Sequence, residues 1–493
     1  MSPALLFSFV IGYFVLLLIV AWVTSRNSNN ESFFIGNRKS NWVLVAFGMI
    51  GTSLSGVTFV SVPGAVGKAF DGGYEGFTYF QVVLGYLIGY MIIAFVLLPL
   101  YYRLKLTSIY TYLSSRLGFV SYKTGAAFFI LSRTLGATAR LYLVVAILQD
   151  TILSSFGVPF WLTTLIILLM ILLYTFEGGV KTIVWTDTLQ TTCMLFGLVI
   201  CVFYILKSLN LGFGEGITAL TDSGYTKMFV GDPQSRLFFF KQVIAGAFIT
   251  VTMTGMDQEM MQKNISVRTL GGSQKNMITF SIIQALVVLL FLFLGGLLYL
   301  YGTANGITAA PDKMFPLIAL GEGVPAIISV VFIIALISAL FPSADGAITA
   351  LTSSFCIDIL GLKRNEAWNE AHKKRIRKTV HLVFAFIFLL LVMMFKWINN
   401  PSMIGVILKV AAYTYGPLLG LFAFGLLTKR QVNDKAVPYI AVASPIICYF
   451  LDKFQKNIFG SFEIGLELII INGLLTFLGL WAVSRKPSVE VKD

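Results

Sequence analysis

The sequence predicts an all-α integral membrane protein with about thirteen transmembrane helices, and three observations lead to that fold class. Hydrophobic residues make up 57% of the 493 residues and charged residues only 12%, whereas soluble domains carry about 25% charged residues. Apolar runs of about 20 residues, long enough to cross a bilayer, recur along the whole chain. Lysine and arginine gather in alternate connections between these runs, as expected of a polytopic membrane protein.

The expected spans leave no room for a soluble domain in the connections. The first run lacks a basic start and a cleavage site, so we expect a retained helix rather than a signal peptide. The longest connection, 207–237, is expected to be an outer loop with short helical turns. The thirteen expected helices cover residues 3–24, 42–66, 77–102, 124–149, 158–176, 183–206, 238–261, 276–301, 324–356, 379–398, 401–427, 436–452 and 462–484.

The placement of basic residues predicts the orientation. Of 36 lysines and arginines, 24 fall in the connections of one side, 8 in those of the other and 4 within or at the edge of helices. Because basic connections stay in the cytoplasm, we expect an inner-membrane protein with its N-terminus outside and its C-terminus inside. The four cysteines show no paired spacing, so neither a disulfide framework nor a zinc site is indicated.

The second expected helix contains glycines and hydroxyl residues near its middle, from Gly48 to Thr58. Such a run is a poor continuous helix, and an unwound turn would expose carbonyl oxygens to a cation. The alternative is a seam of small residues that lets two helices approach closely. A similar interruption, Thr252 to Gln258, lies five spans later, which is the spacing of corresponding helices in a five-plus-five inverted repeat.

The ninth expected helix carries polar residues at membrane depth. Ala339, Pro342, Ser343 and Gly346 share one face, with Asp345 one turn beyond the proline. Proline removes one helical hydrogen bond, so this turn could offer carbonyl and hydroxyl oxygens to a hard cation. The alternative is a simple proline kink without an ion.

Several charged residues are expected inside the membrane. Asp187 and Asp345 could share a second cation site, because two charged carboxylates need a cation or a proton between them; alternatively, Asp187 only stabilises a helix end. Arg133 and Arg140 lie on one helix face, and Lys409 is a third expected buried cation. These cations either form structural ion pairs or attract an anionic solute.

The motif Tyr174-Thr175-x-x-Gly178-Gly179, followed by Val184-Trp185-Thr186-Asp187-x-x-Gln190, resembles a signature of the sodium:solute symporter family. The resemblance implies a LeuT-like five-plus-five inverted-repeat core with broken first and sixth core helices. It divides the chain into a peripheral first helix and inside loop (1–40), a first repeat (41–208), a second repeat (209–430) and two peripheral helices with a cytoplasmic tail (431–493).

The resemblance also implies ion ligands. The family's sodium site corresponds to carbonyls of Gly51, Leu54 and Ala339 and to hydroxyls at positions 342 and 343, of which Pro342 has none and Ser343 has one. A second sodium in some relatives would involve Asp187 and positions 342, 345 and 346. Two of those positions hold Pro342 and Gly346, while the third holds Asp345, so the geometry of a second site is altered.

The solute positions match the family less closely. Polar residues resembling those of sialic acid carriers are Ser53, Ser55, Thr58 and Gln81, and the carboxylate-binding arginine of those carriers would fall near Gly136, between Arg133 and Arg140. Gln284 stands where the family's sugar carriers have a lysine, and Met253 replaces their aromatic residue. We include Arg140 and Lys409 among the expected solute contacts.

The resemblance implies a sodium-coupled symporter that imports a small polar solute by alternating access. The intramembrane cations favour an organic anion, such as a monocarboxylate or a sialic acid, over a sugar, polyol or amino acid. A channel would need a ring of equivalent ligands or a filter loop, and an enzyme would have only His372 and His381 for histidine chemistry. We expect a monomeric unit in the bilayer, no nucleic acid partner, and sodium as coupling ion without any cofactor.

Overall fold

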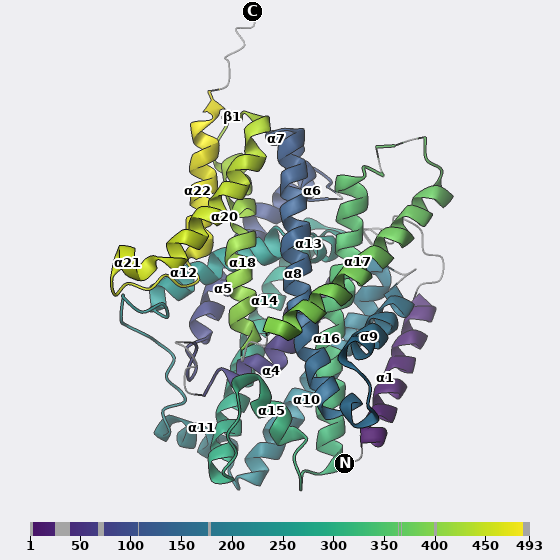
Figure 1. Ribbon diagram of the computed structural model, residues 1–493, viewed down its shortest axis with the longest axis vertical. Coiled ribbons are helices and arrows are strands. Elements are labelled where there is room, and N and C mark those ends of the chain that lie inside the picture. The colour runs from purple at the N-terminus through teal and green to yellow at the C-terminus, as the bar shows by residue number, and fades with distance from the viewer. Residues whose placement is uncertain are drawn as a thin grey trace, which may run out of the picture.

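The computed structural model describes residues 3–24, 40–67, 73–106, 108–175, 179–362, 364–365, 367–398 and 402–486. Gly178 of the signature motif lies outside these ranges. The described chain is a bundle of helices, with α1 starting at one end of the bundle and α22 finishing at the other (Figure 1). The only sheet among the described residues is a two-stranded antiparallel pair, β1 (Gln431–Val432) with β2 (Ser484–Arg485).

The helices follow the expected spans closely. Their bounds are α1 (Pro3–Thr24), α3 (Trp42–Ser53), α4 (Gly56–Gly64), α5 (Phe80–Ile92), η2 (Ile93–Leu97), α6 (Leu98–Arg103), α7 (Thr111–Arg116), α8 (Phe119–Thr151), η3 (Leu153–Phe156), α9 (Phe160–Thr175), α10 (Gly179–Ser208), α11 (Phe213–Asp222), α12 (Phe239–Thr250), η4 (Val251–Gly255), α13 (Gln258–Ile265), α14 (Leu270–Ala304), α15 (Pro311–Ala319), α16 (Ala326–Ser354), η5 (Phe355–Ile359), α17 (Glu370–Ile398), α18 (Met403–Thr414), α19 (Gly416–Leu427), η6 (Asp434–Ala436), α20 (Val437–Lys453), α21 (Gln455–Phe459) and α22 (Leu468–Ala482).

Eight helices in the described part of the chain are long and apolar enough to cross a membrane, and eleven if each of three bent pairs counts as one span. The shorter apolar helices α9 and α22 also coincide with expected spans. An integral membrane protein is therefore confirmed, while the count of thirteen stays a prediction because it requires both shorter helices to cross.

The helix breaks expected near Leu54 and Met256 are present. The first pair, α3 and α4, is bent by 55°, and the second, α12–η4 and α13, by 67°. Asp257 caps α13 by accepting hydrogen bonds from the amides of Glu259 (2.9 Å) and Met260 (3.2 Å). The alternative of a close helix seam holds as well at Gly51, where an added Cβ would lie 2.3 Å from Thr191 Oγ1 on α10.

Two features differ from expectation. Helix α16 runs through Pro342 without a break, because one missing N–H bond is tolerated when the flanking turns are packed on both sides. A third break, a 45° bend at Tyr415 between α18 and α19, was not expected. It falls at Gly416-Pro417, a dipeptide that interrupts helices.

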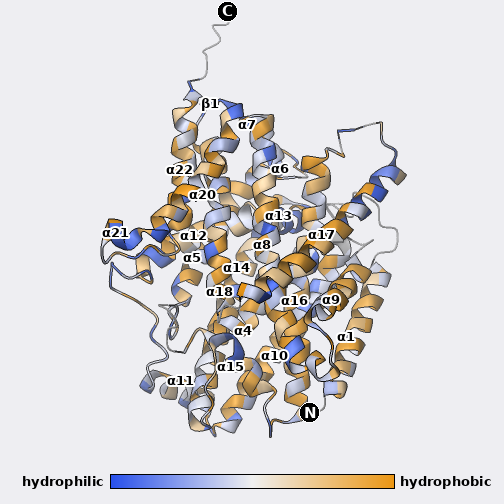
Figure 2. Ribbon diagram, viewed as in Figure 1, coloured by the Kyte–Doolittle hydropathy of each residue, from blue (hydrophilic) through white to orange (hydrophobic). Residues whose placement is uncertain are grey.

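Helix packing depends on small residues at the contact between α5 and α12. An added Cβ on Gly85 would lie 2.1 Å from the carbonyl oxygen of Val243, and one on Gly246 would lie 2.3 Å from that of Val82. Each glycine therefore lets the opposite backbone approach. Away from the core, hydrophobic residues cover the outer helices while hydrophilic ones gather on α21 and at the start of α17 (Figure 2).

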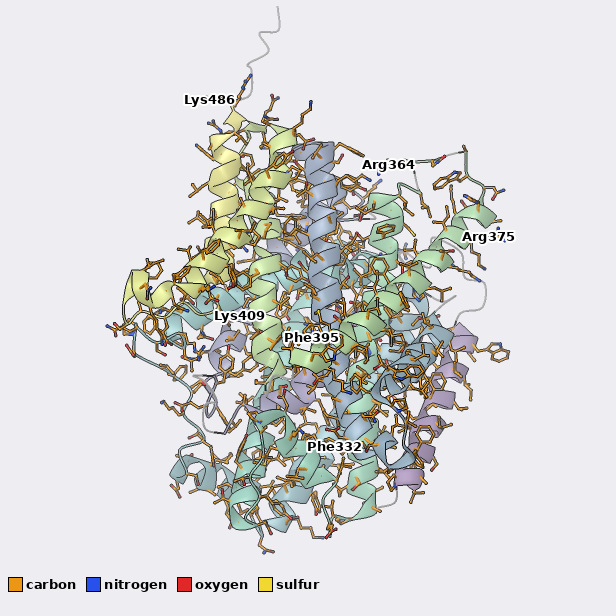
Figure 3. All side chains as sticks on the ribbon, viewed as in Figure 1. Phe332, Arg364, Arg375, Phe395, Lys409 and Lys486 are labelled. Atoms are coloured by element: carbon orange, nitrogen blue, oxygen red, sulfur yellow. The ribbon has the colours of Figure 1, made fainter. Side chains whose placement is uncertain are left out.

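The labelled basic residues Arg364, Arg375 and Lys486 lie at the same end of the bundle as the C-terminus (Figure 3). This is the end that the charge count assigns to the cytoplasm.

Candidate functional site

A cavity lies where the two broken helix pairs meet. Its walls come from the α3–α4 break, α5, α8, α12 with η4, α13, α14 and α18, and they combine hydroxyl, amide, aromatic and apolar side chains with two arginines. The lining residues are Thr52, Ser53, Leu54, Ser55, Val57, Thr58, Tyr79, Tyr86, Tyr90, Arg133, Arg140, Ile249, Thr250, Met253, Thr254, Met260, Gln284, Val288, Ile404, Ile407 and Leu408.

Six of the eight expected solute residues line this cavity: Ser53, Ser55, Thr58, Arg140, Met253 and Gln284. Their polar groups are linked to one another. Gln284 Nε2 donates to Ser53 Oγ at 2.9 Å, and Tyr90 donates to Gln284 Oε1 at 2.6 Å. The break between α3 and α4 thus places hydroxyl groups opposite an oriented amide on α14.

The other two expected solute residues lie elsewhere. Gln81 is buried against the outer loop, where its amide group donates to the carbonyls of Thr78 and Leu237 and accepts from the amide of Val230. Lys409 has a side chain that is 62% exposed and pairs with Asp452 at 2.8 Å. Lys409 was therefore wrongly expected to be a buried cation, because its helix turns that side outward.

The two arginines on α8 differ in their partners. Arg133 is buried and pairs with Glu259, and its Nε lies 3.7 Å from Asp257 Oδ2. Asp257 in turn accepts a hydrogen bond from Tyr415 at 3.3 Å. Arg140, two turns along the same face, lines the cavity and forms no ion pair within the described residues. Its guanidinium group is thus available to a solute.

The expected sodium residues come together where α3 meets α16. All five positions lie on these two helices or at the break, and an added Cβ on Gly51 would lie 3.5 Å from Pro342 Cγ. Ser343 Oγ donates to the carbonyl of Leu340 at 2.8 Å, which leaves its lone pairs free to accept. Helix α3 ends at Ser53, so the carbonyls of its last turn have no continuing helix to bond to.

Asp345 is fully buried on α16, close to these positions in the chain. Tyr174 on α9 donates to its Oδ2 at 2.7 Å, and the amide of Gly346 donates to its Oδ1. Within the described residues no lysine or arginine lies within 4.0 Å of this carboxylate. A buried carboxylate without a cationic partner needs a cation or a proton nearby.

Asp187, by contrast, is already paired with a cation. Lys263 Nζ lies 2.7 Å from Asp187 Oδ2 and 3.3 Å from Glu259 Oε1, and it also donates to Thr52 Oγ1. Thr52 completes the arrangement by donating toward Asp187 Oδ2 at 3.3 Å. Gly346 leaves room for the Glu259 carboxylate, since a Cβ added at Gly346 would lie 2.1 Å from Glu259 Oε1. We call Thr52, Asp187, Glu259 and Lys263 the ammonium cluster.

Sequence reasoning missed three charged residues of this region: Asp257, Glu259 and Lys263. The expected seventh helix ended at residue 261, so Lys263 was counted as a cytoplasmic loop residue. The 67° bend instead turns α13 across the bundle, and Lys263 becomes 2% exposed. The available signal was the spacing of Glu259 and Lys263, four residues apart, because an acidic residue four before a lysine forms a helical ion pair.

Comparison with known proteins places this geometry in a family context. A model of the sodium:solute symporter family matches residues 33–437. The sodium/sialic acid symporter SiaT of Proteus mirabilis is 23% identical over 98% of this chain and 97% of its own length. The human sodium/iodide cotransporter is 24% identical over 84% of this chain, which spans less than two thirds (65%) of that relative's length. A sodium-coupled monocarboxylate transporter of Xenopus laevis is 26% identical over 86% of this chain and 66% of its own length.

Solved structures show the same fold. The substrate-bound, outward-open structure of a Na⁺-coupled sialic acid symporter superposes with a TM-score of 0.80 at 20% identity, over 98% of this chain and 99% of its own. The closed form of Mhp1, a nucleobase-cation-symport transporter, gives a TM-score of 0.54 at 14% identity, over 93% of this chain and 95% of its own. The expected LeuT-like fold is confirmed at this level, while the repeat boundaries stay predictions.

Proposed function

This chain belongs to the sodium:solute symporter family, and on that premise we propose that it uses sodium entry to import a small organic anion. A monocarboxylate or a sialic acid-like solute fits best. Its relatives are transporters rather than enzymes. The inward sodium gradient and the membrane potential would drive alternating access, with each charge that crosses 100 mV contributing about 2.3 kcal/mol.

The observation that carries the proposal is the environment of Arg140. Its guanidinium group lines the cavity without an ion-pair partner in the described chain, whereas Arg133 on the same helix face has two carboxylates. A partly desolvated cation without a counter-charge is costly. A solute carboxylate would neutralise the guanidinium charge, since guanidinium and carboxylate groups form two parallel hydrogen bonds.

A neutral solute is the second candidate, and the polar wall of the cavity favours it. Ser53, Thr58, Tyr90 and Gln284 offer donors and acceptors suited to the hydroxyl groups of a sugar or polyol. The same wall also suits the hydroxyl groups of a sialic acid, which carries a carboxylate for Arg140 as well. An anionic polyhydroxy solute therefore uses both features.

For the coupling sodium ion we propose the carbonyls of Gly51, Leu54 and Ala339 and the hydroxyl of Ser343. Position 342 contributes no hydroxyl, because proline occupies it. Asp345 lies one helical turn after Pro342 and has no cationic partner in the described part of the chain, so its negative charge favours a cation at this place. Sodium, as a hard cation, prefers such oxygen ligands.

The wider organisation follows the family. We propose that the two broken helix pairs begin two inverted repeats, residues 41–208 and 209–430, flanked by residues 1–40 and 431–493. With the basic end of the bundle in the cytoplasm, the N-terminus lies outside the inner membrane. A single chain encloses the cavity, so a monomer is the proposed transport unit.

Uptake into proteoliposomes tests the proposal. Purified full chain is reconstituted, an inward sodium gradient is imposed, and uptake of labelled pyruvate, lactate and sialate is measured against a matched choline gradient. We expect saturable, sodium-dependent uptake of at least one of these anions, and competition by the others of similar size. Competition by glucose and other neutral sugars, with no effect of the three anions, would overturn the anion assignment.

A further inference from the structure

The most unusual feature of the site is a lysine ammonium group bound to Asp187, the aspartate to which the resemblance assigns a second sodium ion. In the relatives with a second ion, the aspartate matching Asp187 and hydroxyls on the ninth helix contribute to that site. Here two of the three matching positions on α16, Pro342 and Gly346, have no side-chain oxygen. The side-chain oxygens left at these positions are those of Asp187 and Asp345.

Asp345 accepts hydrogen bonds from Tyr174 and from the amide of Gly346, whereas Asp187 is engaged by Lys263. Its ammonium group has three N–H donors, and the ammonium cluster supplies three acceptors: Asp187 Oδ2 at 2.7 Å, Glu259 Oε1 at 3.3 Å, and Thr52 Oγ1. Every donor of the charged amine is thus satisfied, although the side chain is 2% exposed. The charges match as well, because Arg133 pairs with the other oxygen of Glu259, so that two cations, Lys263 and Arg133, face the two carboxylates of Asp187 and Glu259.

A sodium ion cannot share these ligands with the ammonium group. Asp187 Oδ1 has no hydrogen-bond partner among the described residues. Asp345 already accepts from Tyr174 and from the amide of Gly346 and is assigned to the first sodium ion. One further carboxylate oxygen is too few for a hard cation, which takes several oxygen ligands. A second unit positive charge about 4 Å from Nζ would also weaken sodium binding by about a thousand-fold at the effective dielectric constant of a protein. The residues present do not fit a second sodium ion.

We propose that the ammonium group of Lys263 is the resident cation at Asp187, so that this symporter carries one sodium ion fewer per cycle than a relative with a sodium ion there. The lysine does structurally what an ion would do. Lys263 lies on α13, in the second half of the chain. It bonds Thr52 on the broken helix α3 and Asp187 on α10, both in the first half, and so holds these three helices together. Unlike an ion, it stays when the cavity opens.

The proposal rests on sodium-coupled transport and specifies how many sodium ions are coupled. Its test measures sodium binding to the wild type and to a variant, and does not depend on solute uptake. Replacing Lys263 by alanine leaves Asp187, Glu259 Oε1 and Thr52 as an oxygen-lined space with no cation at Asp187, while Arg133 stays paired with Glu259 Oε2. We therefore expect Lys263→Ala to bind one more sodium ion per chain than the wild type. Bound ²²Na⁺ is measured by equilibrium dialysis on the purified full chain, with choline keeping the ionic strength constant.

Further variants keep the test decisive if Lys263→Ala is unstable. Lys263→Arg retains the charge, so its sodium count should equal that of the wild type. Lys263→Met combined with Asp187→Asn removes one charge of each sign, which leaves too few ligands for an added ion, so its count should also stay at the wild-type value. A surface control, Lys409→Ala, should likewise change nothing, because Lys409 pairs with Asp452 outside the cavity.

The outcomes separate this inference from the function it rests on. A wild type that binds two sodium ions, or a folded Lys263→Ala that gains none, overturns the assignment of Lys263. If Lys263→Ala does not fold, Lys263→Met alone carries the same test: one added ion supports the assignment and none overturns it, while a higher count in the Lys263→Met and Asp187→Asn double variant than in the wild type also overturns it. A wild type that binds no sodium overturns sodium coupling, while a gain of one ion in Lys263→Ala would still support the role of the lysine.

Discussion

Substitution of Arg140 by glutamine tests the solute assignment most directly. Glutamine keeps a polar side chain but removes the charge that faces the cavity. A hydrogen bond to a charged group contributes about 1.5–3 kcal/mol, and breaking a buried charge pair costs more when its partner is left unpaired. Because no carboxylate of the described residues pairs with Arg140, we expect Arg140→Gln to lose about 2–3 kcal/mol of binding free energy, about 30- to 150-fold in Kd.

The assay is titration calorimetry on purified protein at saturating sodium, with pyruvate, lactate and sialate as ligands. Arg140→Lys should fall between wild type and Arg140→Gln, since lysine keeps the charge but loses the two-pronged geometry. Lys409→Gln is the matched control and should change Kd by less than about twofold, because an exposed ion pair is worth little. If Arg140→Gln binds all three anions as tightly as the wild type, Arg140 does not recognise a carboxylate.

Three further substitutions test other parts of the structure. Ser343→Ala should raise the sodium concentration for half-maximal uptake by about fivefold, the loss of about 1 kcal/mol from one hydroxyl ligand, with a smaller effect on solute affinity at saturating sodium; an unchanged sodium dependence would exclude Ser343 from the ion site. Gly85→Ala should lower thermal stability by about 1–3 kcal/mol, because its Cβ would meet a backbone oxygen at 2.1 Å, whereas Gly12→Ala, with nothing within 4 Å, should not; equal melting temperatures would refute the contact. Burial raises the pKa of Asp312, on the connecting helix α15, to about 6, although a hydrogen bond from the amide of Met403 opposes the shift. The packed helix therefore favours the protonated acid, and its packing should become more stable as pH falls. Between pH 7.5 and pH 5 the protection factor of the α15 amides, which is the intrinsic exchange rate at each pH divided by the observed rate, should rise by about tenfold. Asp312→Asn should abolish that rise, and an equal rise in this variant would contradict the prediction.

Local composition was enough to predict the broken helices. The runs from Gly48 to Thr58 and from Thr252 to Gln258 combine glycine, serine and threonine within apolar segments, and their weak helix propensity acts wherever the segments lie. The break at Gly416-Pro417 carried an equally local signal and was overlooked. Apolar length and the placement of basic residues likewise predicted the membrane class, since the bilayer itself imposes both patterns.

The partners of the charged residues depended on the tertiary structure. Arg133, Arg140 and Lys409 look alike in sequence, yet one forms two buried ion pairs, one faces the cavity alone and one meets Asp452 at the periphery. Which carboxylate reaches which cation is decided by how the bent helices cross, and residues 76 and 126 positions apart in the chain then meet.

Lys263 shows most clearly that the tertiary structure decides the environment and the partners of a charged residue. Its sequence position, just beyond an apolar run, is typical of a cytoplasmic connection. The bend after Gly255 redirects α13 into the bundle, where Asp187 from α10 and Thr52 from α3 approach the ammonium group. The sequence by itself determined that this is a membrane transporter with two interrupted helices and intramembrane charges. Only the tertiary structure decided which of those charges neutralise one another, because burial makes pairing obligatory while the angle between helices selects the partner.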